Sequence, residues 1–267
     1  MLPRECTQPG HRHGRPCGDH RHDRPATGAD ATGAGLSDRI SRQLQSAIAV
    51  GLLNDGDKLP PENVLAEQLG VSSITLRQSL AEMRLKGLVE TRRGRGGGSF
   101  ISGKALATPE QLLAEFKRRS PEDLRDLGDL AATIAAGVGR RAALRADEQD
   151  LRRCRELARR FARATTAEEL RRTDSRFHIS LGVAAQSRRL TNATIQVHSE
   201  LASLLWVGGA SAASVRTASE EHDAILDAIE GRDEEAADRL AAAHFERESE
   251  VLLDFFLELA TATPEET

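Results

Sequence analysis

Three histidines and an aspartate in the C-terminal half of the sequence have the types and spacing of metal ligands. Asp174 and His178 are four residues apart, which places a carboxylate and an imidazole one turn apart on the same face of a helix. His222 and His244 are predicted to lie about 15 Å from the turn that joins two antiparallel helices, and thus to face each other. Such donors suit Zn, Ni, Mn or Fe. For each histidine, the alternative is a buried, hydrogen-bonded side chain without a metal.

A second set of polar residues lies in the N-terminal half, on a helix that is predicted to follow a tight turn. Such a helix places polar side chains in the major groove of DNA while its other face packs in a core. The residues predicted to contact DNA from this helix are Ser72, Ser73, Thr75, Arg77 and Gln78. A glycine-rich basic segment follows, and its Arg93, Arg95 and Gly96 are expected to reach the minor groove or the phosphates. The alternative is that these arginines are solvated surface charges.

The positive charge of the chain is local. Lys and Arg number 37 against 41 Asp and Glu in 267 residues, so the net charge of -4 excludes a basic surface that covers the whole molecule. Residues 77–104 differ, because they hold seven basic residues and only two acidic ones. This segment is therefore the predicted nucleic-acid-binding surface.

Composition further limits the class of protein. Only 3% of the residues are aromatic, so the cores must consist of Ala, Leu, Ile and Val, which favours packed helices over a β-sandwich. Three cysteines are too few for a disulfide framework. The sequence also lacks an apolar run of about 20 residues and the apolar segment of a signal peptide. A cytoplasmic protein that contacts no membrane is expected.

Hydrophobic periodicity divides the chain into two domains. Residues 36–103 are predicted to form three helices and a β-hairpin, which together make a winged helix-turn-helix. Residues 109–260 have a helical period throughout and predict a bundle of six or seven helices. A disordered tail at 1–35, a linker at 104–108 and a short tail at 261–267 complete the chain. The predicted fold class is thus mainly α, with an N-terminal winged helix-turn-helix and a C-terminal all-α bundle.

The N-terminal domain resembles the winged helix-turn-helix of GntR-type bacterial transcription regulators. The resemblance rests on the order and spacing of Leu59-Pro60-Pro61-Glu62, Leu65-Ala66-Glu67-Gln68-Leu69-Gly70-Val71-Ser72, Leu76-Arg77-Gln78-Ser79-Leu80, Gly87-Leu88-Val89 and Arg93-Gly94-Arg95-Gly96. It implies binding to a double-stranded DNA operator. This chain carries Asn63 and Ser73 where the family usually has arginines, whereas Arg77 is kept. Its operator sequence and affinity are therefore expected to differ from those of many relatives.

The C-terminal domain is similar to the FCD effector-binding domain of the FadR subfamily of GntR regulators. The similarity lies in Asp174-Ser-Arg-Phe-His178, in Glu221-His222-Asp223-Ala224-Ile225-Leu226-Asp227-Ala228-Ile229, and in Ala236-Ala237 through His244. In many members an Asp and three His bind a divalent metal, and a small carboxylate completes the coordination. The resemblance implies that Asp174, His178, His222 and His244 have this role here. Arg216 and His198 are the candidates for contact with the effector.

The leading hypothesis is a transcriptional repressor whose operator binding is modulated by a small carboxylate-type metabolite at the metal site. A homodimer would place two recognition helices on a near-palindromic site. One alternative is a helical metal-dependent hydrolase, which needs a metal-bound water and a positioned acid or base. The other is a metal-free interaction module whose histidines are inert.

Overall fold

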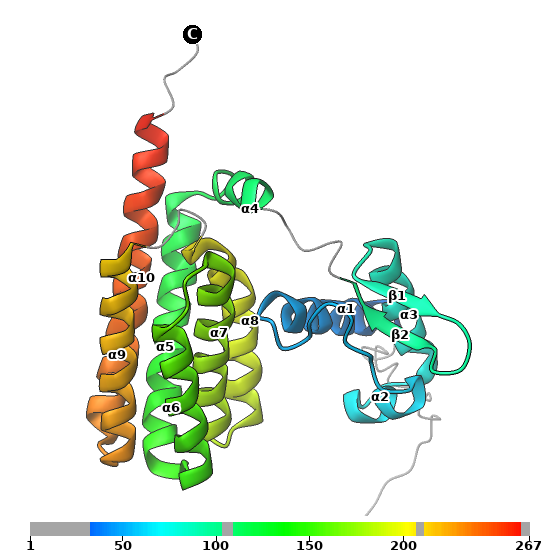
Figure 1. The fold of residues 1–267 in the computed structure, drawn as a ribbon, viewed down its shortest axis with the longest axis horizontal. Coiled ribbons are helices and arrows are strands. Elements are labelled where there is room, and N and C mark those ends of the chain that lie inside the picture. The colour runs from blue at the N-terminus through cyan, green and yellow to red at the C-terminus, as the bar shows by residue number, and fades with distance from the viewer. Residues whose placement is uncertain (1–32, 103–108, 207–210, 263–267) are drawn as a thin grey trace, which may run out of the picture.

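The computed structural model describes residues 33–102, 109–206 and 211–262, which form ten helices and a two-stranded sheet (Figure 1). The predicted fold class is confirmed. Most of the predicted tail at 1–35, the linker at 104–108 and the last five residues lie outside the described ranges. Helix α1 (Gly33–Ala49) begins three residues inside the predicted tail, and α10 (Glu234–Ala262) ends two residues beyond 260.

The N-terminal domain is a winged helix-turn-helix. It contains α1, α2 (Glu62–Leu69), α3 (Ser73–Leu85) and an antiparallel hairpin of β1 (Val89–Arg92) and β2 (Gly98–Ile101). Apolar residues of these elements, spaced at helical or strand periods, converge in one core. The largest fully buried members of this core are Ile40, Leu76, Leu80, Met83 and Ile101.

The turn between α2 and α3 depends on two residues. Gly70 adopts φ 66°, a left-handed conformation that glycine accepts without steric cost, and its N–H bonds the last turn of α2. Ser72 then caps α3, because its hydroxyl accepts the backbone N–H of Thr75 at 3.1 Å. These local interactions fix the angle at which the candidate recognition helix α3 leaves α2.

In the part of the C-terminal domain that the structure describes there are seven helices, within the predicted number. They are α4 (Pro109–Phe116), α5 (Pro121–Arg145), α6 (Glu148–Ala162), α7 (Ala167–Ala184), α8 (Arg188–Leu205), α9 (Ala212–Glu230) and α10. The long helices α5 and α10 lie side by side (Figure 1). Their close approach requires Gly139, where a Cβ atom would lie 2.4 Å from the Ala237 carbonyl oxygen. None of the described helices is long and apolar enough to cross a lipid bilayer.

The break between α5 and α6 lies where no glycine or proline marks it. Helix α5 ends at Arg145, and Asp147 begins α6 by accepting the backbone N–H of Asp150. The Asp150 carboxylate in turn accepts the N–H of Asp147, which completes a capping box. The helical period of apolar residues continues from α5 into α6 without a break. The Asp-x-x-Asp spacing of Asp147 and Asp150 is therefore the sequence signal for the boundary between the two helices.

The two domains meet at the C-terminal end of α1. Arginines of α7 hold the turn that follows α1: Arg176 donates to the Gly51 carbonyl at 2.6 Å, and Arg172 donates to the Asn54 side-chain oxygen at 2.7 Å. Arg171 also donates to the Ala49 carbonyl. Because α7 also carries Asp174 and His178, a single helix touches the winged helix-turn-helix and holds two of the four candidate metal ligands.

Candidate functional site

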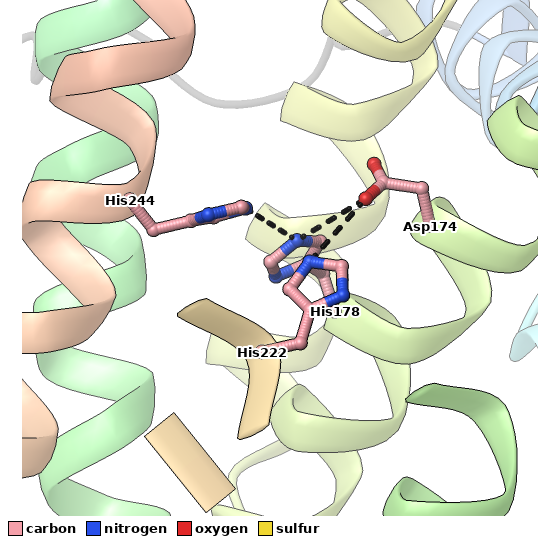
Figure 2. A group of neighbouring side chains, drawn as sticks. All are labelled: Asp174, His178, His222 and His244. Atoms are coloured by element: carbon pink, nitrogen blue, oxygen red, sulfur yellow. Dashed lines mark hydrogen bonds and ion pairs between the residues drawn. The ribbon is translucent and has the colours of Figure 1, made fainter. Parts of the chain in front are cut away.

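Asp174, His178, His222 and His244 converge inside the bundle (Figure 2). Asp174 and His178 come from successive turns of α7, His222 from α9 and His244 from α10. The α9–α10 hairpin places His222 and His244 at one level, with their ring centroids 4.9 Å apart. All four side chains are buried, and one ligand atom from each lies within 4.8 Å of the others.

The distances within this cluster are those of ligands that surround a common centre. Asp174 Oδ1 lies 3.7 Å from His178 Nε2 and 3.5 Å from His222 Nε2. His178 Nε2 and His244 Nε2 are 3.1 Å apart. Three imidazole nitrogens and one carboxylate oxygen therefore point at the same small volume.

The polar atoms of the cluster need a partner that the neighbouring side chains do not supply. Both carboxylate oxygens of Asp174 and both ring nitrogens of His222 are buried, with no hydrogen-bond partner among the residues that the structure describes. Leaving one such group unpaired costs about 1–3 kcal/mol. A divalent cation would satisfy these atoms, and imidazole with carboxylate suits Zn, Ni, Mn or Fe. The four residues thus fit a metal ion.

Burial keeps imidazoles in the site neutral. Burial and the neighbouring His244 lower the pKa of His222 well below its ordinary value. Burial and the nearby His178 lower the pKa of His198 to about 3. A neutral imidazole offers a lone pair, which is the form that binds a metal.

His244 is oriented by a second carboxylate. Its Nδ1 donates to Glu221 at 2.7 Å, which leaves Nε2 as the atom that faces His178. Arg247 donates to the same Glu221 carboxylate at 2.6 Å. Although burial opposes it, hydrogen bonding from His244 and Arg247 lowers the pKa of Glu221 to about 2. Glu221 is therefore a carboxylate anion that positions His244.

The candidate recognition helix presents four of its five predicted residues to solvent. Ser72, Ser73, Arg77 and Gln78 are exposed. Thr75 is buried, and its hydroxyl bonds that of Ser72 at 2.9 Å, so it supports the start of α3.

Arg77 forms an ion pair that is accessible to solvent, so Arg77 can exchange its partner. Its Nε donates to Glu62 at 2.8 Å, and 68% of the Arg77 side chain is exposed. Exposed pairs of this kind contribute little to stability, so a DNA phosphate or base could replace Glu62.

The wing extends the same basic surface. Arg93, Arg95 and Gly96 lie in the exposed loop between β1 and β2. Lys58 donates to the Gly96 carbonyl at 3.0 Å, which ties the loop to the segment before α2. Arg92 lies over the Phe100 ring, 4.4 Å from its centroid, so its guanidinium is held against the hairpin.

Comparison with known proteins links both domains to one family. Residues 36–98 match the model of the gntR family of bacterial regulatory proteins, and residues 126–247 match the FCD domain. The HTH-type transcriptional regulator RmpR of Mycobacterium gastri is 40% identical over 228 residues, which cover 85% of this chain and 83% of that protein. The protein belongs to the GntR family. This GntR regulator is a DNA-binding transcription regulator, and its FCD domain is of the FadR type.

More distant relatives of this GntR regulator include another HTH-type transcriptional regulator. LutR of Bacillus subtilis is 28% identical over 215 residues, which cover 78% of this chain and 97% of LutR. Among solved structures, McbR/YncC of E. coli is 19% identical, covers 83% of this chain and 98% of its own, and has a TM-score of 0.45. The matched families and relatives are transcription regulators, so the hydrolase alternative is wrong.

The two predicted effector contacts of this GntR regulator lie in different places. His198 is buried, and its ring stacks on His178 with centroids 4.8 Å apart. Both histidines line a small, mostly apolar cavity of about 20 Å³, enough for about one water molecule. Arg216 is exposed and lines a separate surface hollow with Thr165. The structure thus brings His198 to the cluster but not Arg216.

Two further residues of the GntR regulator stand out that the sequence analysis did not select. Ile74, in the first turn of α3, is 71% exposed, and an apolar side chain there is suited to contact a thymine methyl group. Glu248 is buried one turn after His244, with Oε1 at 3.3 Å from His244 Nε2. The i, i+4 spacing of His244 and Glu248 is the sequence signal for this pair.

Proposed function

We propose that this GntR regulator is a repressor whose operator binding responds to a small carboxylate metabolite at a metal site in the FCD domain. The observation that carries the proposal is the buried cluster of Asp174, His178, His222 and His244, with unpartnered polar atoms on Asp174 and His222. We further propose that it acts in the cytoplasm as a homodimer on a near-palindromic operator.

The protein's own residues divide the work at this site. Asp174, His178, His222 and His244 would hold the ion, and Glu221 keeps Nε2 of His244 directed at it. A divalent ion here supplies a positive centre that attracts a carboxylate. His198 lines the adjoining cavity and would contact the effector from there. Zn, Ni, Mn and Fe are all compatible with these donors.

The DNA-binding domain supplies the second half of the proposed function. Ser72, Ser73, Arg77 and Gln78 of α3 would contact the operator, and Thr75 supports them from beneath. Arg93, Arg95 and Gly96 of the wing would contact the minor groove or the phosphates. The clustering of these basic and polar groups on one exposed helix and one exposed loop supports this assignment.

Helix α7 is the proposed link between the two halves. It carries the ligands Asp174 and His178, and its Arg172 and Arg176 bond the turn after α1 of the DNA-binding domain. A ligand shifts a conformational equilibrium only by its differential affinity for the two states. An effector that moves α7 by binding near Asp174 would therefore change how the DNA-binding domains are held.

The test is elemental analysis of protein purified without chelators, together with thermal shift against mono-, di- and tricarboxylates and sugar acids. The expected result is one divalent metal per chain and stabilisation by one class of carboxylate, which then weakens operator binding. Protein without metal that responds to no carboxylate would overturn the proposal and favour the metal-free interaction module. Stabilisation without loss of DNA binding would contradict the repressor role.

A further inference from the structure

Glu248 is a buried carboxylate that the four-residue cluster does not account for. It lies on α10 one turn beyond His244, and only 3% of the residue is exposed. Its Oε1 lies 3.3 Å from His244 Nε2, and its Oε2 has no hydrogen-bond partner among the described residues. Arg247, its neighbour in sequence, directs its guanidinium at Glu221 instead. Arg247 therefore acts on Glu248 only through its charge, and no described side chain donates a hydrogen bond to Oε2.

The position of Glu248 matters because of the nitrogen that it approaches. His244 Nδ1 is occupied by Glu221, so Nε2 is the atom that would bind a metal. Ligands about 2.0–2.2 Å from one ion lie about 3.0–3.5 Å from their neighbours in the coordination sphere. The 3.3 Å between Glu248 Oε1 and His244 Nε2 falls in this range, as does the 3.1 Å between His244 Nε2 and His178 Nε2.

We propose that Glu248 is a fifth protein ligand of the metal held by Asp174, His178, His222 and His244. The inference rests on the proposed metal-binding function and deepens it. Two carboxylates would then face the ion from different helices, Asp174 from α7 and Glu248 from α10. Their two negative charges would balance the two positive charges of a divalent ion, which lowers the free-energy cost of burying the ion.

A fifth protein ligand restricts what else can bind. Zinc is mostly four-coordinate in proteins, whereas five protein donors suit the larger coordination number of Mn, Fe or Ni. An octahedral ion retains a single open position, so an effector would coordinate through one atom. The cavity beside His178 and His198 is lined largely by apolar side chains such as Ala135, Val138 and Phe245. This cavity of about 20 Å³ holds about one water molecule, so only a very small group of an effector would fit beside the open position.

The experiment compares the full-length wild type with Glu248→Gln, each stripped of metal and titrated with Co²⁺. Glu248→Gln keeps the shape of the side chain but removes its charge. We expect Co²⁺ to bind at least about tenfold more weakly to the variant. We also expect its visible absorption to strengthen, because cobalt with fewer ligands absorbs more strongly. Glu250→Gln is the matched control, since Glu250 is exposed two residues further along α10 and its loss should change neither readout.

The possible results distinguish the role of Glu248 from metal binding itself. Wild type that binds no Co²⁺ would overturn both. Wild type and Glu248→Gln with equal affinity and equal spectra would overturn the role of Glu248 alone and assign it to a hydrogen bond with His244. If circular dichroism shows that Glu248→Gln does not fold, Glu248→Asp replaces it. That variant keeps the charge but shortens the reach, and wild-type affinity with a wild-type spectrum would overturn the role.

Discussion

The two domains of this GntR regulator hold their functional residues in opposite ways. In the winged helix-turn-helix, Arg77 leaves 68% of its side chain in solvent and pairs with the half-buried Glu62. In the FCD domain, His222 and Asp174 are completely buried and have unpartnered polar atoms. The first site is an open surface that a large partner can cover, and the second is an enclosed cluster whose donors fit a metal ion.

This difference indicates how each site tolerates change. An exposed arginine can change partners at low cost, so altering it should affect DNA binding and little else. The buried side chains of the cluster would share one proposed ion, so removing one of them would weaken the pairing of all the others. Replacements in the FCD domain are therefore expected to have larger effects than those on the recognition helix.

The largest effect is expected from His222→Ala, which removes one of the four proposed metal ligands. Metal affinity should fall by more than about a hundredfold, because loss of a direct ligand exceeds the cost of losing an outer partner. Elemental analysis and chelator competition measure the change. Glu220→Ala, at an exposed position two residues earlier, should keep full metal content. Equal metal content in the two variants would remove the contrast between the domains.

A smaller effect is expected from Arg77→Ala on the recognition helix. Operator affinity should fall about tenfold to a hundredfold, the range for loss of one specific arginine contact, while metal content stays unchanged. Fluorescence anisotropy with DNA selected by the wild-type protein measures it. Arg159→Ala, at an exposed position of α6, is the matched control. If both variants lost the same affinity, the DNA surface would have to lie elsewhere.

Acid should destabilise the metal-free FCD domain but spare the winged helix-turn-helix. The pKa of His198 falls from about 6.5 to about 3 on folding, so below pH 6.5 the unfolded chain binds a proton that the folded chain does not. Between pH 7 and 5.5 this histidine alone should lower the free energy of unfolding by about 1 kcal/mol. Residues 36–103 contain no histidine.

Urea unfolding of metal-free protein at the two pH values tests this expectation. The single tryptophan, Trp206, is buried in the FCD domain and reports its unfolding by fluorescence. His198→Gln should reduce the difference between the two pH values. A midpoint that is the same at pH 7 and 5.5 would mean that the histidines titrate freely in the folded protein.

The smallest effect is expected where the two domains touch. Arg176→Ala removes the donor to the Gly51 carbonyl, and one such hydrogen bond is worth about 1 kcal/mol. Amide hydrogen exchange at residues 49–54 should accelerate a few-fold, with metal content and α3 unaffected. Arg163→Ala, at the exposed end of α6, should leave the exchange unchanged. Unaltered exchange in Arg176→Ala would show that α7 does not hold this turn.

Much of the winged domain could be predicted from the sequence because its signals are local. Gly70 and Ser72 specify the turn and the cap within three residues of each other. The pairing of β1 with β2 follows from two β-prone runs around a glycine-rich loop. The sequence did not predict which side chains of α3 face the solvent. Thr75 is buried although it was predicted to contact DNA, and Ile74 is exposed. The packing of α3 against α1 decides that rotation, and neighbours in sequence do not.

The FCD domain shows where prediction from sequence stops. Equal distances of His222 and His244 from one turn predict that they meet, because an antiparallel helical hairpin has a fixed rise per residue. How these histidines meet α7 depends on the rotation and packing of α7, α9 and α10. The same packing lets Glu221 bond His244 and buries Glu248. The surface position of Arg216 has the same cause. The types and spacing of the candidate ligands can be read from the sequence. Which polar groups share the enclosed site depends on the packing of distant segments, because burial arises from contacts between them.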